Sequence, residues 1–117
     1  MTLNLRDDIH QMHAHLCSAL ADPNRIMILY CLRNNSINVT TLADELDLPQ
    51  PTVSRHLKVL RESNLVERER VGHSVIYELT EKRVIDALDL LRGVLADSLQ
   101  RQSKIARTAA ESLSALN

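Results

Sequence analysis

The sequence contains few aromatic residues and few glycines, and each shortage excludes a class of protein. It has two tyrosines and neither phenylalanine nor tryptophan, so its core must consist of Leu, Ile, Val, Met and Ala. Its two glycines form no GxGxxG or Walker pattern, which argues against a phosphate-binding loop. No Ser, His, Cys or acidic side chain is placed by a catalytic motif. We therefore expect that this chain is not an enzyme.

Long apolar runs and disulfide-forming cysteine patterns are also missing. The apolar runs are only a few residues long, such as the one that includes residues 26–29, whereas a membrane span needs about 20 apolar residues. Residues 1–8 lack the basic start and apolar region of a signal peptide. Two cysteines are too few for a disulfide scaffold. These features favour a cytoplasmic protein with no membrane partner and one domain over residues 1–117.

The net charge is close to zero, at −1, but the charges are unevenly distributed. Residues 1–47 carry more acidic than basic side chains, whereas residues 50–61 carry no acid. The basic side chains of this second segment are Arg55, Lys58 and Arg61. A protein with little net charge binds DNA locally when its cations form one stripe. The distribution therefore indicates a nucleic-acid partner for the second segment.

The spacing of apolar residues predicts a mainly helical fold with one small β-hairpin. Apolar residues recur every three or four positions in five segments, and the pattern changes period in two segments on either side of Gly72 and His73. The expected helices cover about 5–20, 23–33, 41–46, 51–63 and 81–116, and the expected strands cover 66–71 and 74–79. Asp22 is expected to cap the second helix, Asn64 to end the fourth with a left-handed backbone, and Thr80 to cap the last.

This order of elements is that of a winged helix-turn-helix. Residues 40–63 supply the helix-turn-helix and residues 66–79 supply the wing. The second helix of such a unit enters the major groove of double-stranded DNA and reads bases near its N-terminus. Polar and basic side chains are therefore expected to contact DNA from the helix and the wing: Gln50, Thr52, Ser54, Arg55, His56, Lys58, Arg70 and His73.

The length of the last predicted helix indicates a homodimer. Residues 81–116 contain no proline, and a helix of this length spans about 54 Å, whereas a 100-residue domain has a radius of gyration of about 13 Å. The helix therefore either lies along a second chain or covers its own domain and frays beyond about residue 100. We favour the dimer, built on the first and last helices. Its expected contacts are Leu5, Ile9, Met12, Val84, Leu88, Leu91 and Leu95.

Two segments resemble the ArsR/SmtB family of winged-helix repressors. These are Ala19–Ile26, with the sequence ALADPNRI, and Leu48–Leu60, with the sequence LPQPTVSRHLKVL. The resemblance covers roughly residues 9–95. It implies a homodimeric, sequence-specific repressor that leaves an inverted-repeat operator when a small signal binds. The alternative is a winged-helix module that binds proteins and not DNA. The acid-free stretch at 50–61 favours the repressor.

The resemblance does not identify the signal. Metal-sensing relatives use a Cys-x-Cys pair on the first helix of the helix-turn-helix, or Asp and His on the last helix. Here residues 42–47 contain no Cys and residues 81–117 contain neither His nor Cys. We therefore expect no required cofactor. The remaining candidate sensor residues are His10, His13, Cys17 and Cys31.

Two sensor mechanisms could involve these side chains, and a third interpretation assigns the cysteines no sensor role. A metal ion on the first helix needs further ligands from elsewhere, because residues 10 and 17 are about 10 Å apart along a helix axis. A redox pair of Cys17 and Cys31 needs Cα atoms within about 7 Å. The third interpretation is that both cysteines are core residues.

Overall fold

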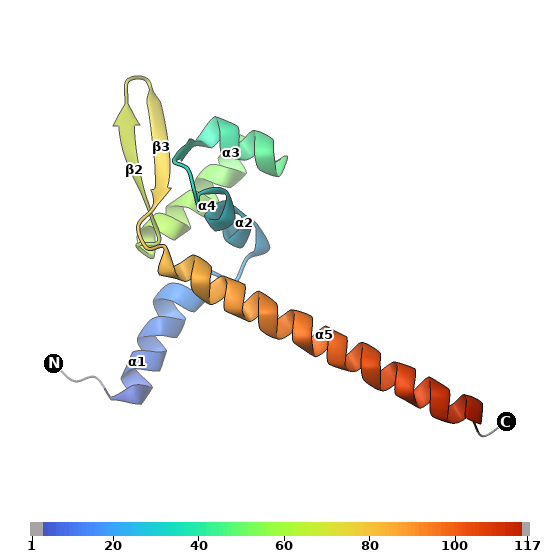
Figure 1. The fold of residues 1–117 in the computed structure, drawn as a ribbon. Coiled ribbons are helices and arrows are strands. Elements are labelled where there is room, and N and C mark those ends of the chain that lie inside the picture. The colour runs from blue at the N-terminus through green and yellow to red at the C-terminus, as the bar shows by residue number, and fades with distance from the viewer. Residues whose placement is uncertain (1–3, 116–117) are drawn as a thin grey trace. The chain divides into compact units, whose positions relative to one another are not determined.

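The computed structural model describes residues 4–115 of the chain. Contacts group the described residues up to Lys82 into one compact unit and the last helix, α5 (Arg83–Ala115), into another. The first unit contains, in chain order, α1 (Leu5–Met12), a π-helical segment η1 (His13–Cys17), α2 (Pro23–Cys31), β1 (Ile37–Asn38), α3 (Val39–Leu46), α4 (Gln50–Glu62), β2 (Val66–Val71) and β3 (Ser74–Leu79) (Figure 1). The predicted winged helix-turn-helix is confirmed.

The first helical region is interrupted, so the prediction of one continuous helix over residues 5–20 is wrong. The α-helix ends at Met12, and the backbone N–H of Ser18 then donates to the carbonyl of His13 at 3.1 Å, five residues back. The Ser18 hydroxyl also donates to the Ala14 carbonyl at 2.6 Å. The Ser18 hydroxyl thus bonds to a helix carbonyl at the same place where the backbone forms the wider turn.

The start of α2 follows the sequence prediction. The Asp22 carboxylate accepts from the backbone N–H groups of Asn24 and Arg25 at 2.8 and 3.4 Å, and Pro23 opens the helix. An aspartate at this position satisfies N–H groups that have no partner within the helix. Behind this cap, α2, α3 and α4 enclose the core of the first unit. Its buried apolar side chains are Ala19, Ile28, Leu29, Leu32, Leu42, Ala43, Val53, Leu57, Leu60, Leu65, Val66 and Tyr77.

A third strand, which the sequence analysis did not predict, extends the hairpin. β1 pairs with β3, with Ile37 opposite Tyr77, and the sheet order is β1-β3-β2. Its second residue, Asn38, also begins α3, because its side chain accepts from the Thr41 N–H at 2.8 Å. One residue thus ends a strand and caps a helix. α3 accordingly begins at Val39, two residues before the predicted start.

Two non-glycine residues with positive φ shape the turns around α4. Asn64 has φ 60°, as predicted, and Asp47, which ends α3, has φ 54°. These short polar residues tolerate the left-handed conformation better than others. The prediction that Thr80 caps the last helix is wrong, because α5 begins at Arg83. The Thr80 hydroxyl instead donates to the Asn64 carbonyl and links the end of β3 to the end of α4.

The second unit is a single helix of 33 residues, about 50 Å long at 1.5 Å per residue. It remains helical to Ala115, so the structure does not support fraying beyond residue 100. Ile85 and Leu88 are its buried side chains, whereas most of its large apolar residues are exposed. Across residues 4–115, no helix combines the length and the apolar character that a membrane span requires.

Candidate DNA-binding surface

The exposed face of α4 is set by three apolar anchors on its opposite side. Val53, Leu57 and Leu60 are fully buried, at positions separated by four and three residues. This spacing fixes the rotation of the helix about its own axis, since these residues share one face. Ser54, Arg55 and Lys58 consequently point to solvent, as the sequence predicted, and Gln50 is exposed at the N-terminus of the helix.

Two of the predicted DNA-contacting side chains are held by neighbouring threonines. Gln50 Nε2 donates to Thr40 Oγ1 of α3 at 3.3 Å, and Arg55 Nη2 donates to Thr52 Oγ1 at 3.3 Å. Sequence reasoning missed Thr40, because its only signal is its place near the start of the first helix of the motif. These contacts restrict Gln50 and Arg55 while both remain exposed. An ordered arginine or glutamine loses less entropy when it binds a base edge.

The wing carries the remaining predicted contacts. β2 and β3 pair from Val66–Leu79 to Val71–Ser74, and Gly72 opens the connecting turn with φ 62°. Arg70 and His73 are exposed, as predicted. Successive side chains of a strand alternate between faces, so Arg68 lies on the same face of β2 as Arg70. Sequence reasoning missed Arg68, although its spacing of two from Arg70 was the available signal.

The base of the wing contains a pair of like charges. Glu67 of β2 lies directly opposite Glu78 of β3. A hydrogen bond with the Glu78 carboxyl raises the pKa of Glu67, and desolvation and the charges of Glu78 and Glu69 act in the same direction. The folded state therefore binds more protons than the unfolded state at this site. The pair weakens the fold as pH rises through the folded-state pKa, and acid removes that penalty.

The Glu67→Gln variant is accordingly expected to unfold at a higher temperature than the parent at neutral pH. The gain should shrink as the pH becomes acidic, because the parent then protonates the same site. Thermal unfolding followed by circular dichroism across this pH range measures the difference. Glu69→Gln is the comparison variant and should gain less, since Glu69 lies opposite Ile76 and acts on Glu67 only through its charge. An equal gain in both variants, or a gain independent of pH, contradicts this assignment.

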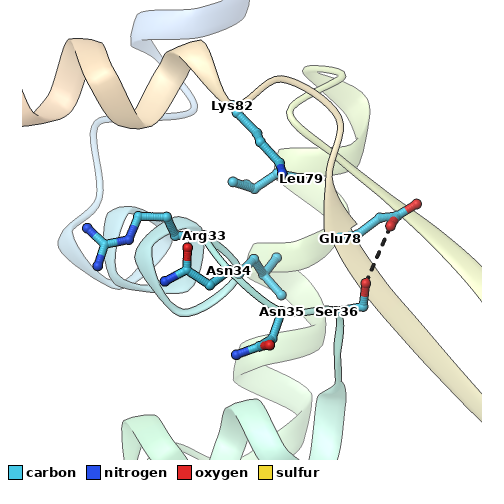
Figure 2. A pocket seen from close by; sticks show the side chains of 8 residues that line it. Arg33, Asn34, Asn35, Ser36, Glu78, Leu79 and Lys82 are labelled. Atoms are coloured by element: carbon cyan, nitrogen blue, oxygen red, sulfur yellow. Dashed lines mark hydrogen bonds between the residues drawn. The ribbon is translucent and has the colours of Figure 1, made fainter.

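Glu78 also lines a small polar hollow (Figure 2). The Ser36 hydroxyl donates to Glu78 Oε2 at 3.3 Å across it. Its volume is about 100 Å³, and its lining residues are Leu32, Arg33, Asn34, Asn35, Ser36, Glu78, Leu79 and Lys82. Pockets that bind small molecules measure roughly 300–1,000 Å³ and are mostly apolar. This hollow is therefore smaller and more polar than a typical small-molecule pocket.

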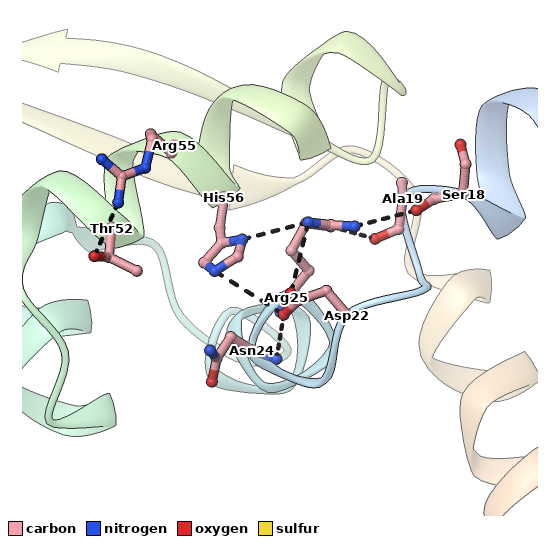
Figure 3. A network of polar contacts seen from close by, with 8 residues as sticks. All are labelled: Ser18, Ala19, Asp22, Asn24, Arg25, Thr52, Arg55 and His56. Atoms are coloured by element: carbon pink, nitrogen blue, oxygen red, sulfur yellow. Dashed lines mark hydrogen bonds and ion pairs between the residues drawn. The ribbon is translucent and has the colours of Figure 1, made fainter.

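The structure corrects the predicted placement of His56. Its side chain is only 15% exposed and faces the start of α2, away from the surface of Arg55 and Lys58. His56 Nδ1 lies 3.4 Å from Arg25 Nη1, and His56 Nε2 lies 3.9 Å from Asp22 Oδ1 (Figure 3). The ring is thus held by polar contacts with α2 and does not lie on the surface predicted to contact DNA.

The carboxylate end of this network is ionised at neutral pH. Desolvation by itself raises the pKa of Asp22. The hydrogen bond from the Asn24 N–H, the neighbouring His56 and the contacts with Arg25 outweigh it, so the pKa of Asp22 lies below its ordinary value. Asp22 therefore serves as a charged cap for α2 and as a negatively charged neighbour for His56.

The structure places the candidate sensor residues in two different environments. Cys17 is exposed at the end of η1, so its interpretation as a core residue is wrong, and Cys31 of α2 is partly buried. Both thiols are free. Burial and the adjacent Glu45 carboxylate raise the pKa of the Cys31 thiol, which keeps it protonated and less nucleophilic. Within residues 4–115 of a single chain, no group of three His, Cys, Asp or Glu side chains is arranged to hold a metal ion. His10 and His13 lie on α1 and η1.

Most residues predicted to form the dimer leave apolar surface uncovered in the single chain. Every residue of α1 is exposed, including Leu5, Ile9 and Met12. On α5, Leu91 is 62% exposed and Leu95 is 59% exposed. The same helix supplies two exceptions. Val84 is half-buried, and Leu88 is buried within the chain, so Leu88 cannot offer surface to a partner as predicted.

Comparison with known proteins agrees with this architecture. Residues 22–68 match the family described as "Bacterial regulatory protein, arsR family". The HTH-type transcriptional regulator NmtR of Mycobacterium tuberculosis is 43% identical over 76 residues, which are 65% of this chain and 63% of NmtR. The biofilm growth-associated repressor of Agrobacterium fabrum is 38% identical over 81 residues, 69% of each chain. The match thus spans slightly less than two thirds of NmtR.

A solved structure shows the same fold. The crystal structure of the transcriptional repressor BigR from Xylella fastidiosa matches with a TM-score of 0.65 at 32% identity. The match covers 80% of this chain and 96% of that one. The resemblance noted from Ala19–Ile26 and Leu48–Leu60 is thereby confirmed.

Proposed function

Because the chain belongs to the ArsR family of bacterial regulatory proteins, we propose that it is a homodimeric transcriptional repressor that binds an inverted-repeat operator. The observation that carries this proposal is the exposed face of α4. Its residues include Ser54, Arg55 and Lys58, its segment contains no acid up to Arg61, and its rotation is fixed by buried anchors. A helix with such a face can enter the major groove, because it brings no carboxylate close to the DNA phosphates.

Each exposed side chain of this surface has a role in the proposed complex. Gln50 and Arg55 have the fork geometry that reads adenine and guanine edges. Lys58 and Arg70 neutralise phosphates, which positions the protein without selecting a sequence. In this proposal the chain contacts DNA with its own side chains and no metal or cofactor, and it acts in the cytoplasm, where the operator is. A releasing signal acts near His13 and Cys17, where the thiol is exposed.

The exposed apolar side chains of α1 and α5 support the homodimer. A second copy of the chain presents the same side chains, so each set can be covered by a partner copy related by a two-fold axis. The two-fold axis also gives the protein two recognition helices. Half-sites one helical turn apart lie about 34–36 Å from centre to centre, which is the spacing that such a dimer must match.

Binding to the DNA upstream of its own gene tests the proposed function. The parent protein is expected to shift that duplex in a gel at concentrations about 10³-fold lower than a random duplex of equal length requires. A footprint on the shifted duplex should show two related half-sites. If no duplex binds better than random sequence at moderate salt, the alternative of a winged-helix protein–protein module replaces the repressor.

Lys58→Ala and Arg70→Ala are each expected to weaken binding to operator and random duplexes by the same factor. Each variant loses a phosphate contact and therefore releases fewer counterions. The slope of log affinity against log salt concentration should fall by about one in each variant. Fluorescence anisotropy at several salt concentrations measures both quantities.

Lys82→Ala is the matched control for these two variants. Lys82 is exposed and follows the end of β3, at the opposite end of the hairpin from Gly72. Its loss should leave the salt slope unchanged. A variant at Lys58 or Arg70 that relaxes the preference at a single base pair contradicts the assignment to phosphates.

A further inference from the structure

A chain of polar contacts connects α4 with the segment that joins η1 to α2. The guanidinium of Arg25 lies at its centre (Figure 3). Arg25 Nε donates to the Ala19 carbonyl at 2.6 Å, and Arg25 Nη2 donates to the Ser18 carbonyl at 3.1 Å. Its third nitrogen, Nη1, lies 3.4 Å from His56 Nδ1 of α4. One side chain thus holds two carbonyls of the linking segment and the ring of the recognition helix.

The contact between Arg25 Nη1 and His56 Nδ1 favours one tautomer of the His56 ring. A guanidinium group only donates hydrogen bonds, so His56 Nδ1 must accept from Arg25 and carry no hydrogen. The proton of the neutral ring then lies on Nε2, which faces Asp22 Oδ1 at 3.9 Å. Asp22, His56 and Arg25 therefore alternate in polarity: a carboxylate, a donor, an acceptor and a cation. A second proton on His56 removes the acceptor and places two cations side by side.

The polar contacts join three parts of the first unit: the start of α2, the Ser18–Ala19 segment and α4. Asp22 and Arg25 lie in the first turn of α2, and Asp22 also caps that helix. Ser18 and Ala19 directly follow η1, whose last residue is Cys17. A shift of the Ser18–Ala19 backbone moves the carbonyls that hold Arg25. Because the guanidinium is planar and rigid, the same shift changes its contact with His56.

We propose that Asp22, Arg25 and His56 are positioning residues that fix α4 for operator binding and connect it to the Ser18–Ala19 segment. This inference rests on the proposed function and identifies how the DNA-binding surface is held. Only differential interaction with two arrangements of a protein shifts the balance between them. The Arg25–His56 contact provides such a difference, because it exists only when the linking segment and α4 are correctly placed.

Operator affinity of single and double variants tests the proposal. His56→Leu and Arg25→Met are each expected to weaken operator binding by about tenfold, within the range for coupling between sites, and to leave random-duplex binding unchanged. The double variant should bind no more weakly than either single variant, since both remove one connection. Fluorescence anisotropy with the footprinted operator duplex measures each affinity at a temperature where circular dichroism shows the variant folded.

Two further variants separate positioning from general stability. His56→Asn keeps an acceptor close to the position of Nδ1, so it is expected to recover most of the operator affinity that His56→Leu loses. Arg33→Met is the matched control for Arg25→Met, because Arg33 is an exposed arginine beyond the end of the same helix. Additive losses in the double variant, or equal losses at Arg33 and Arg25, overturn the proposal.

A measurement without DNA keeps this inference distinct from the proposed function. Long-range ¹H–¹⁵N spectra of the full-length protein report which imidazole nitrogen carries the proton. We expect a proton on Nε2 and none on Nδ1 of His56 in the parent, and a loss of this preference in Arg25→Met. If the parent selects no duplex but shows this tautomer, the repressor function fails and the network stands. If the operator binds but the tautomer is different, the network is wrong.

Discussion

Replacing both Leu91 and Leu95 with glutamate is expected to convert the protein into a monomer and to abolish operator binding. These side chains are 62% and 59% exposed in the single chain, and they lie four residues apart on one face of α5. Neither contributes to the buried part of the helix, which is formed by Ile85 and Leu88. The substitutions therefore remove dimer contacts and leave the side chains buried in each chain in place.

The size of this effect follows from the area that a partner covers. Burial of one leucine side chain contributes about 1.5–3 kcal/mol, and a two-fold interface contains two copies of each. Because each side chain is about 60% exposed in the single chain, loss of the four leucines removes roughly 4–7 kcal/mol, whereas a dimer with a micromolar Kd is held by about 8 kcal/mol. Glutamates at the same positions add unpaired charges to the interface. Sedimentation equilibrium should therefore show a monomer at micromolar concentration.

Leu90→Glu is the matched control for the dimer interface. Leu90 is 73% exposed and adjacent to Leu91, but one residue along a helix turns the side chain by about 100°. This variant is expected to remain a dimer and to bind the operator as the parent does. A monomeric Leu90→Glu, or a Leu91→Glu/Leu95→Glu double variant that still sediments as a dimer, places the interface elsewhere.

The parts of the fold that follow a regular period were predictable from the sequence. Both long strands have the predicted bounds, because the helical period is absent from residues 66–71 and 74–79 and Gly72 and His73 mark the turn between them. The cap at Asp22 was predictable for a similar reason. Aspartate before proline is a local signal that needs no knowledge of the rest of the fold. The resemblance to the family then added the expected function.

The parts that depend on a specific hydrogen bond were not predictable. β1 has two residues, which is too short for any alternation, and its pairing with β3 depends on residues far away in the sequence. The π-turn of η1 depends on one shifted backbone bond from Ser18 to His13. The spacing of apolar residues predicts neither feature, since neither depends on which side chains are apolar.

The orientation of the His56 side chain could have been predicted from its spacing to the buried residues of the same helix, but the sequence analysis did not use that spacing. It follows Val53 by three residues and precedes Leu60 by four, so it shares the face of the buried anchors. Its polar side chain suggested DNA contact, and the network with Asp22 and Arg25 became visible only in the structure. A polar residue at an anchor position of a recognition helix is therefore better interpreted as an internal contact than as a base contact.

Removal of the Arg55 side chain is expected to produce the largest loss of sequence preference. Arg55→Ala should weaken operator binding by about 1–3 kcal/mol, the range for one good bidentate contact to a base, which is a factor of about 5–150 in Kd. The side chain is exposed and is held by Thr52 Oγ1 at 3.3 Å, two features that suit direct contact with a guanine edge. Random-duplex affinity should fall much less, because only one charge is lost.

Arg55→Lys separates the geometry of this side chain from its charge. Lysine keeps the positive charge but lacks the planar fork that pairs with two acceptors of guanine. This variant is expected to retain the affinity of the parent for random duplexes and to lose most of the discrimination at one base pair of each half-site. Competition with operator duplexes altered at single positions identifies that base pair. A lysine variant that keeps the parent's preference at every position shows that Arg55 contacts phosphate, and base selection then depends on Gln50 and Ser54.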